Sequence, residues 1–164
     1  MSTSAVATVD LMSRPAVPPS DTPAPALLLT YPGSDRTQAL DPERHEVAVV
    51  DPLMSAFTAV QHHWPAIVAH SGRVLVVAPA SAALGDPQRP LDAAVTGGLI
   101  SLVRSLAIEL RRHGATANIL FFRDSPEDPA LPTMIAALLD ESAHAVTGQE
   151  IYAADDLGLG KLRP

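Results

Sequence analysis

The fold is decided by residues 71–122, SGRVLVVAPASAALGDPQRPLDAAVTGGLISLVRSLAIELRRHGATANILFF. Short apolar runs at 72–79 and 116–122 begin and end this stretch, and such runs are typical of buried strands. Between them, residues 91–113 carry apolar side chains at helical spacing, and Gly114 follows where a helix often ends. A strand, a long helix and a second strand predict a parallel β-sheet with a helix packed on it.

The same alternation extends on both sides of this stretch. Residues 26–33 are an apolar run that ends in Pro-Gly, and residues 46–70 have apolar side chains at helical spacing. After the third strand come a short helix at 131–143 and a fourth strand at 148–154. The sequence therefore predicts an α/β domain of about four parallel strands flanked by helices.

The N-terminal segment differs from the rest in composition. Residues 13–25 contain five prolines, which remove backbone donors and disfavour helix. We therefore expect an extended, flexible segment at 1–25 and a folded domain at 26–164. Within that segment, residues 5–12 are β-branched enough to predict a short strand.

Composition excludes several classes of protein. A net charge of −7 argues against nucleic-acid binding, which relies on clustered Lys and Arg. The absence of Cys rules out thiolate nucleophiles, disulfides and Cys-based zinc sites. We expect no membrane span and no secretory signal, because the apolar runs are short, so a cytoplasmic protein is predicted.

Five motifs in register resemble the short-chain dehydrogenase/reductase family. Residues 71–122 resemble its strand, loop, catalytic helix and following "G-x-x-V-N" strand. LTYPG (29–33) stands at the family's "V-N-N-A-G", DPLMSAF (51–57) at its "x-N-L-x-x-x-F", and VTGQEIYAADD (146–156) at its terminal "I-T-G-Q" strand. The resemblance covers about residues 26–156 and implies a partial Rossmann-like fold.

The alignment also shows which catalytic groups are missing. The family's Asn, Ser, Tyr and Lys would stand at Pro52, Pro79, Asp92 and Thr96, so all four are replaced. The glycine-rich turn that holds the dinucleotide pyrophosphate has no counterpart before Ala26. The resemblance therefore implies a truncated, degenerate member, and we expect no catalytic residue and no cofactor.

Three other groups could carry chemistry. Asp92 could act as a base, but a carboxylate near a helix start is commonly a cap or a dipole partner. Tyr31 is expected to be a packing residue or loop anchor. His62 and His63 point in different directions on a helix, so no metal site is expected.

The helices at 50–70 and 91–113 are the expected partner surface, because the resemblance implies that they form a four-helix contact between subunits. The residues expected there are Phe57, Gln61, Ala93, Gly97, Ile100, Arg104 and Ile108. The strand at 26–33 would be an apolar edge, which something must cover. Either residues 5–12 or another chain could do so.

These observations favour a non-catalytic subunit that assembles with a full-length, active short-chain dehydrogenase/reductase and stabilises or tunes it, though pairing with itself stays open. Two alternatives remain at this stage. One is an enzyme that uses Asp92 as the base of a lyase or isomerase reaction. The other is a homodimeric module that binds a small apolar ligand.

Overall fold

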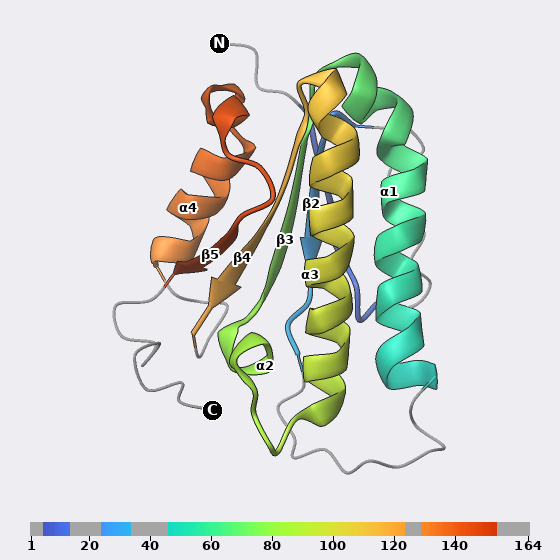
Figure 1. The fold of residues 1–164 in the computed structure, drawn as a ribbon, viewed down its shortest axis with the longest axis vertical. Coiled ribbons are helices and arrows are strands. Elements are labelled where there is room, and N and C mark those ends of the chain that lie inside the picture. Colours follow the sequence, from blue (N-terminus) through green and yellow to red (C-terminus); the bar gives the residue numbers. More distant parts are fainter. Residues whose placement is uncertain (1–4, 14–23, 34–45, 124–128, 154–164) are drawn as a thin grey trace.

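The computed structural model describes residues 5–13, 24–33, 46–123 and 129–153, which form one sheet flanked by helices (Figure 1). The strands are β1 (Val6–Asp10), β2 (Ala26–Thr30), β3 (Arg73–Pro79), β4 (Thr116–Phe122) and β5 (Glu150–Ala153). The longer helices are α1 (Asp51–Ala69), α3 (Pro90–Leu110) and α4 (Ala130–Leu139). Shorter helical stretches are η2 (Glu46–Val50), α2 (Ala80–Leu84), η3 (Arg111–His113) and η4 (Glu141–Ala145).

The sheet is parallel and runs in the order β1-β2-β3-β4-β5. This confirms the predicted fold class and adds one strand to the four expected. The additional strand is β1, which was predicted as a short strand at 5–12 and pairs with β2 from Val6 opposite Ala26 to Asp10 opposite Thr30. Residues 6–10 therefore cover the edge that β2 would otherwise expose, which was one of the two possibilities.

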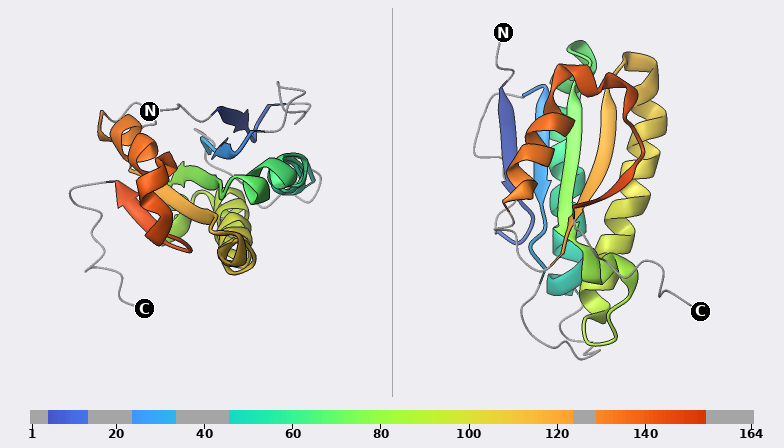
Figure 2. Two further views of the ribbon diagram at one scale, coloured as in Figure 1. Left: turned by 90° about the horizontal axis from the view of Figure 1, so that it is seen from above. Right: turned by 90° about the vertical axis from the view of Figure 1, so that its left-hand side faces the viewer.

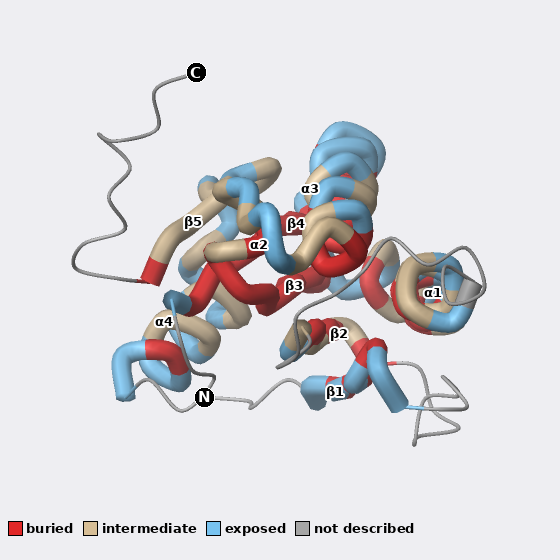
Figure 3. The backbone as a smooth tube through the Cα atoms, turned by 90° about the horizontal axis from the view of Figure 1, so that it is seen from below, coloured by how far each residue is buried: buried red, intermediate tan, exposed pale blue. Residues whose placement is uncertain are grey.

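Helices cover both faces of the sheet. In the views of Figure 2, α1 and α3 lie on one face and α4 lies on the other. The central strands β3 and β4 are buried along their whole length, as their red colour in Figure 3 shows. Alternate residues of these strands face the two helical layers, so Val76 packs toward α1 and α3 while Val77 packs toward α4.

Glycines allow close approach at two points of this packing. A Cβ on Gly72 would lie 2.0 Å from the carbonyl oxygen of Pro25. Only glycine at position 72 therefore leaves room for the backbone that leads into β2. A Cβ on Gly98 would lie 2.7 Å from a methyl of Leu53, which brings α3 directly against α1. The predicted helix end at Gly114 is also confirmed, because its φ of 68° is left-handed.

Two motifs that carried the resemblance contact each other. The side-chain amide of Asn118 on β4 donates to the carbonyl of Val146 and accepts from the amide of Gln149. The amide of Gly148 donates to the carbonyl of Ala117 at 2.7 Å. These bonds fix the loop before β5 against β4, so this pair of motifs stabilises the fold.

The expectation of no membrane span was based on short apolar runs, but α3 is longer and more apolar than that argument assumed. Residues 90–113 are long and apolar enough to pass a test for a membrane span. In the structure, however, α3 buries one side against the sheet through residues such as Val95, Leu99 and Val103. Its hydrophobicity is that of a core helix.

The short helix α2 was not predicted from the sequence, because its Ala-rich residues were expected to form a loop.

His63 on α1 holds the segment that leads into β2. Its ring is fully buried, and Nδ1 accepts a hydrogen bond from the amide of Ala24 at 2.8 Å. Burial lowers the pKa of His63, and the neighbouring His62 lowers this pKa further. The imidazole is therefore held in its neutral form.

We predict that this histidine makes folding pH-dependent. The unfolded chain binds a proton at His63 near the ordinary pKa of about 6.5, whereas the folded chain does so only at lower pH. The free energy of unfolding should therefore fall as the pH drops from about 7 toward 5. In His63→Asn, whose amide oxygen can still accept from Ala24, denaturation curves should show a smaller fall. The control Gln61→Asn, on the same helix, should keep the original slope, and an unchanged slope in His63→Asn would contradict the assignment.

Candidate functional site

The carboxyl ends of the parallel strands meet at one edge of the sheet, where α/β proteins usually bind ligands. Tyr31 follows β2 at this edge, and Asp92 lies in the first turn of α3. The Tyr31 hydroxyl donates a hydrogen bond of 2.7 Å to Asp92 Oδ1. Each residue is only 1% exposed. This buried pair joins the end of β2 to the start of α3.

The electrostatics of the pair keep the phenol protonated. Burial, the hydrogen bond to Asp92 and the negative charge of that carboxylate all raise the pKa of Tyr31, burial having the largest effect. A catalytic phenol needs the opposite shift, which a neighbouring cation supplies. The arrangement is therefore suited to a structural donor and not to a proton-transfer group.

The four positions aligned with the catalytic residues do not form an alternative acid–base set. Pro79 ends β3, and a Cβ on Gly33 would lie 3.0 Å from Pro79 Cγ and 3.4 Å from Asp92 Oδ2, so these residues are packed together. Thr96 lies one turn beyond Asp92 and is fully buried, and its hydroxyl has no hydrogen-bond partner among the residues that the structure describes. Pro52 is buried separately in the first turn of α1.

The structure refines the expectation for Asp92. Arg89 and not Asp92 occupies the N-cap position of α3, and the Arg89 side chain makes no capping hydrogen bond. Asp92 stands in the first helical turn, where a carboxylate is still favourable beside the helix dipole. Its contact with Tyr31 was missed, because 61 residues separate the two in sequence. The expected role of Tyr31 as an anchor matches this contact.

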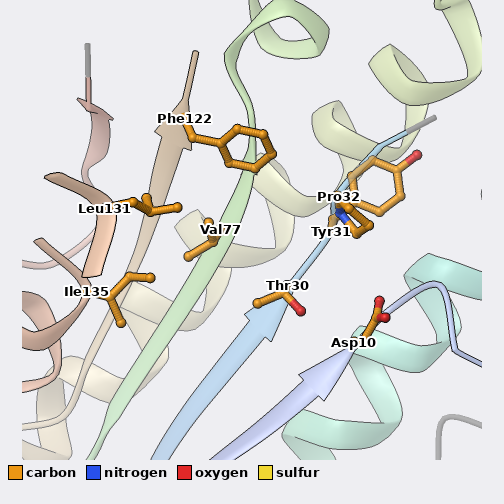
Figure 4. A pocket seen from close by; sticks show the side chains of 8 residues that line it. All are labelled: Asp10, Thr30, Tyr31, Pro32, Val77, Phe122, Leu131 and Ile135. Atoms are coloured by element: carbon orange, nitrogen blue, oxygen red, sulfur yellow. The ribbon is translucent and has the colours of Figure 1, made fainter. Parts of the chain in front are cut away.

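A cavity of about 310 Å³ lies at the same edge of the sheet, between the strand ends and α4 (Figure 4). The Tyr31 ring forms part of its wall, but the hydroxyl points away from Val77 and Leu131. The side chains that line the cavity are Asp10, Thr30, Tyr31, Pro32, Val77, Phe122, Leu131 and Ile135. Asp92 is not among them.

The residues at this edge do not fit a dinucleotide. A pyrophosphate needs glycines after the first strand and donors from a helix N-terminus. Here no glycine occurs between β1 and β2, and Leu11, directly after β1, is buried. The turn is closed by the carboxylate of Asp10, which accepts from the amide of Met12 and the hydroxyl of Ser13. A carboxylate in this place repels phosphate.

The histidines of α1 do not form a metal site. The rings of His62 and His63 meet edge to face with centroids 4.8 Å apart, and His63 Nδ1 is occupied by the amide of Ala24. Within the described ranges there is no group of three His, Cys, Asp or Glu side chains arranged to hold a metal ion.

The helices α1 and α3 lie side by side on one face of the sheet (Figure 1). Of the residues expected at a partner surface, the exposed ones are Phe57, Gln61, Gly97, Arg104 and Ile108, the last at 79%. Ala93 and Ile100 are only half-buried, and Ile100 packs partly on the core. Arg104 turns toward β5, where it forms an ion pair with Glu150 at 2.5 Å.

Sequence reasoning missed several exposed positions on these two helices. Met54 on α1 is exposed beside Phe57, and Ala94, Ser101 and Ser105 are exposed on α3. Local sequence patterns give no signal for them, because the rotation of α3 is set by packing such as the tight contact of Gly98 with Leu53. We call Met54, Phe57, Gly97, Ser101 and Ile108 the two-helix face.

Comparison with known proteins finds one curated relative and several solved structures that resemble this chain. No family model matches the chain. Among curated proteins, the chain is 30% identical over 156 residues to a short-chain dehydrogenase/reductase family member, NovK from Streptomyces niveus. The match covers 79% of this chain but 63% of NovK, so the chain spans less than two thirds of that relative's length.

Solved structures share the fold at lower identity. An acetoin dehydrogenase from Enterobacter cloacae superposes with a TM-score of 0.69 at 19% identity, covering 85% of this chain and 67% of that one. A putative oxidoreductase from Escherichia coli K-12 gives a TM-score of 0.68 at 18% identity, covering 80% of this chain and 64% of that one.

We predict that Tyr31→Phe lowers the free energy of unfolding by about 1–3 kcal/mol, because it removes the hydroxyl donor to a buried carboxylate. Asp92→Asn keeps an acceptor for the hydroxyl and should cost less. Denaturant unfolding of both single variants and the double variant measures the coupling between them. Additive effects would show that the two side chains do not interact.

We predict that Thr96→Val is neutral or stabilising by up to about 1 kcal/mol, since it removes a buried hydroxyl that has no partner. Thr147→Val is the matched control, because the Thr147 hydroxyl accepts from the amide of Ala117. The control should be destabilised by about 1 kcal/mol in the same denaturation experiment. Strong destabilisation by Thr96→Val would mean that its hydroxyl does have a partner.

Proposed function

We propose that the chain is a non-catalytic accessory subunit related to the short-chain dehydrogenase/reductase family, which is supported by its 30% identity to NovK and by the fold that it shares with solved oxidoreductases. In this proposal it assembles with a full-length, active member of the family in the cytoplasm and stabilises or tunes that partner. The single observation that carries the proposal is the buried hydrogen bond between Tyr31 and Asp92. It occupies the edge of the sheet where a catalytic phenol would need to reach a substrate.

The remaining chemistry of the edge supports a non-catalytic role. Thr96 offers no cation to lower the pKa of a phenol, and Pro79 offers no side-chain donor or acceptor. The turn after β1 is closed by Asp10 and lacks glycine. At this edge, the described residues therefore provide neither a dinucleotide site nor an exposed proton donor.

Asp92 is poorly placed to act as a base for another reaction. A general base must come within hydrogen-bond reach of its substrate. The Asp92 side chain is 1% exposed, is bonded to Tyr31 and is not part of the cavity wall. A lyase or isomerase reaction at this carboxylate is the less favoured reading.

The two-helix face supports assembly with a relative. It combines the large apolar side chains Met54, Phe57 and Ile108 with the small residues Gly97 and Ser101, so a second pair of helices could approach closely. A full-length relative would present the equivalent pair of helices. A chain without its own chemistry contributes to a reaction only through a partner that has it, which favours such a relative over a second copy.

We predict that the chain and a full-length relative encoded beside it co-elute from a sizing column at micromolar concentration. Phe57→Glu and Ile108→Glu should each weaken the pairing at least about 30-fold, as expected where central apolar contacts are lost. Met12→Glu is the matched control, since Met12 and Phe57 are both 46% exposed but Met12 lies in the turn after β1.

The outcomes separate the proposal from its alternatives. Reduced co-elution for the helix variants, with unchanged co-elution for Met12→Glu, supports the accessory role. Separate elution of the two proteins contradicts it. A dimer of this chain alone, lost in the same two variants, would replace the proposed partner with a second copy.

A further inference from the structure

The cavity at the carboxyl edge of the sheet has a wall that is mainly apolar. Pro32, Val77, Phe122, Leu131 and Ile135 make up five of its eight lining residues. Their side chains come from the ends of three strands and from α4, and Figure 4 shows them around one space. A volume of about 310 Å³ is at the lower end of the range for small-molecule sites. It suits a molecule of one or two ring systems.

Helix α4 is anchored over the sheet independently of any ligand. The Arg73 guanidinium, at the start of β3, donates to the carbonyls of Asp140 and Glu141 just after the helix. The same side chain donates to the carbonyl of Gly72. These bonds hold the far end of α4, so Leu131 and Ile135 face a preformed space.

The polar groups in the wall already have partners. The Thr30 hydroxyl donates to the carbonyl of Val9, and the Tyr31 hydroxyl donates to Asp92 outside the cavity. The Asp10 carboxylate accepts from Met12 and Ser13 and keeps lone pairs for one further donor. A ligand therefore gains mainly from apolar contact, with a single hydrogen bond at the rim.

The charges of the residues that line the cavity disfavour an anionic ligand. None of the eight described residues that line the cavity is Lys, Arg or His, and the one charged residue, Asp10, is acidic. The chain as a whole carries a net charge of −7. A phosphate or sulfonate would enter a negative field with no cation to receive it.

We propose that this cavity binds a small, uncharged, mainly aromatic or alicyclic molecule that offers one donor to Asp10. This inference goes beyond the accessory role and does not depend on it. The proposed ligand also differs in class from a dinucleotide, which the residues at this edge do not fit. The site belongs to the chain alone, so it can be tested without any partner.

The test uses two fluorescent probes that share one skeleton. N-phenyl-1-naphthylamine is uncharged and carries one N–H donor, whereas 8-anilino-1-naphthalenesulfonate adds a sulfonate to it. Titration of the purified chain should give a dissociation constant at least about tenfold lower for the uncharged probe. In Asp10→Asn the ratio should shrink, because the repulsion is gone. Equal or tighter binding of the sulfonate by the unaltered chain would overturn the proposal.

Variants on α4 locate the binding. Ile135→Trp fills the cavity and should lower the affinity for the uncharged probe at least about tenfold. Ala136→Trp places the same side chain at an exposed position of the same helix and should leave the affinity unchanged. Circular dichroism and a thermal melt show whether each variant is folded.

A measurement on the unaltered chain keeps the test decisive if Ile135→Trp does not fold. Addition of N-phenyl-1-naphthylamine should shift the methyl NMR signals of Val77, Leu131 and Ile135 through ring currents. The methyl signals of Met54 and Ile108, on the two-helix face, should stay in place. Shifts confined to the two-helix face, or no binding of the probe, would overturn the proposal.

Discussion

The hydrogen bond between Tyr31 and Asp92 is the interaction on which the carboxyl edge of this sheet depends. It joins the end of β2 to the first turn of α3 with both side chains buried, and Gly33 and Pro79 pack around it. Breaking it would leave a polar group in an apolar surrounding, which costs more than the bond contributes when formed. In the proposed function, this structural contact takes the place of a reactive edge.

The rest of the fold is retained around that contact. The parallel sheet, the layer of α1 and α3, and the contact of Asn118 with the loop before β5 all serve packing and hydrogen bonding of the backbone. These features stabilise the domain whether or not it performs chemistry. In the proposed function, the fold is kept without the activity, because different residues carry each.

Sequence predicted much of the fold, because its signals were local. The alternation of apolar runs with helical spacing identified β2, β3, β4 and β5 together with α1, α3 and α4. The strand at 6–10 was predicted from its β-branched residues, but its parallel pairing with β2 came only with the structure.

The site was less predictable, because its contacts join residues that are far apart in the sequence. The resemblance placed Pro52, Pro79, Asp92 and Thr96 at the four catalytic positions. The partner of Asp92 was not predicted, since 61 residues separate it from Tyr31. The rotation of α3, which half-buries Ala93 and Ile100 and exposes Ser101, depends on the contact between Gly98 and Leu53. Such contacts depend on tertiary packing and leave little trace in local patterns.

We propose that the carboxyl edge of this chain does not bind a nicotinamide dinucleotide. A fluorescence titration of the purified chain with NADPH tests it most directly, with a full-length, active relative as the positive control. The account predicts no saturable signal for this chain at concentrations up to about 1 mM, while the control saturates. Saturable binding in the micromolar range, followed by NADPH oxidation when a ketone is added, would contradict the account.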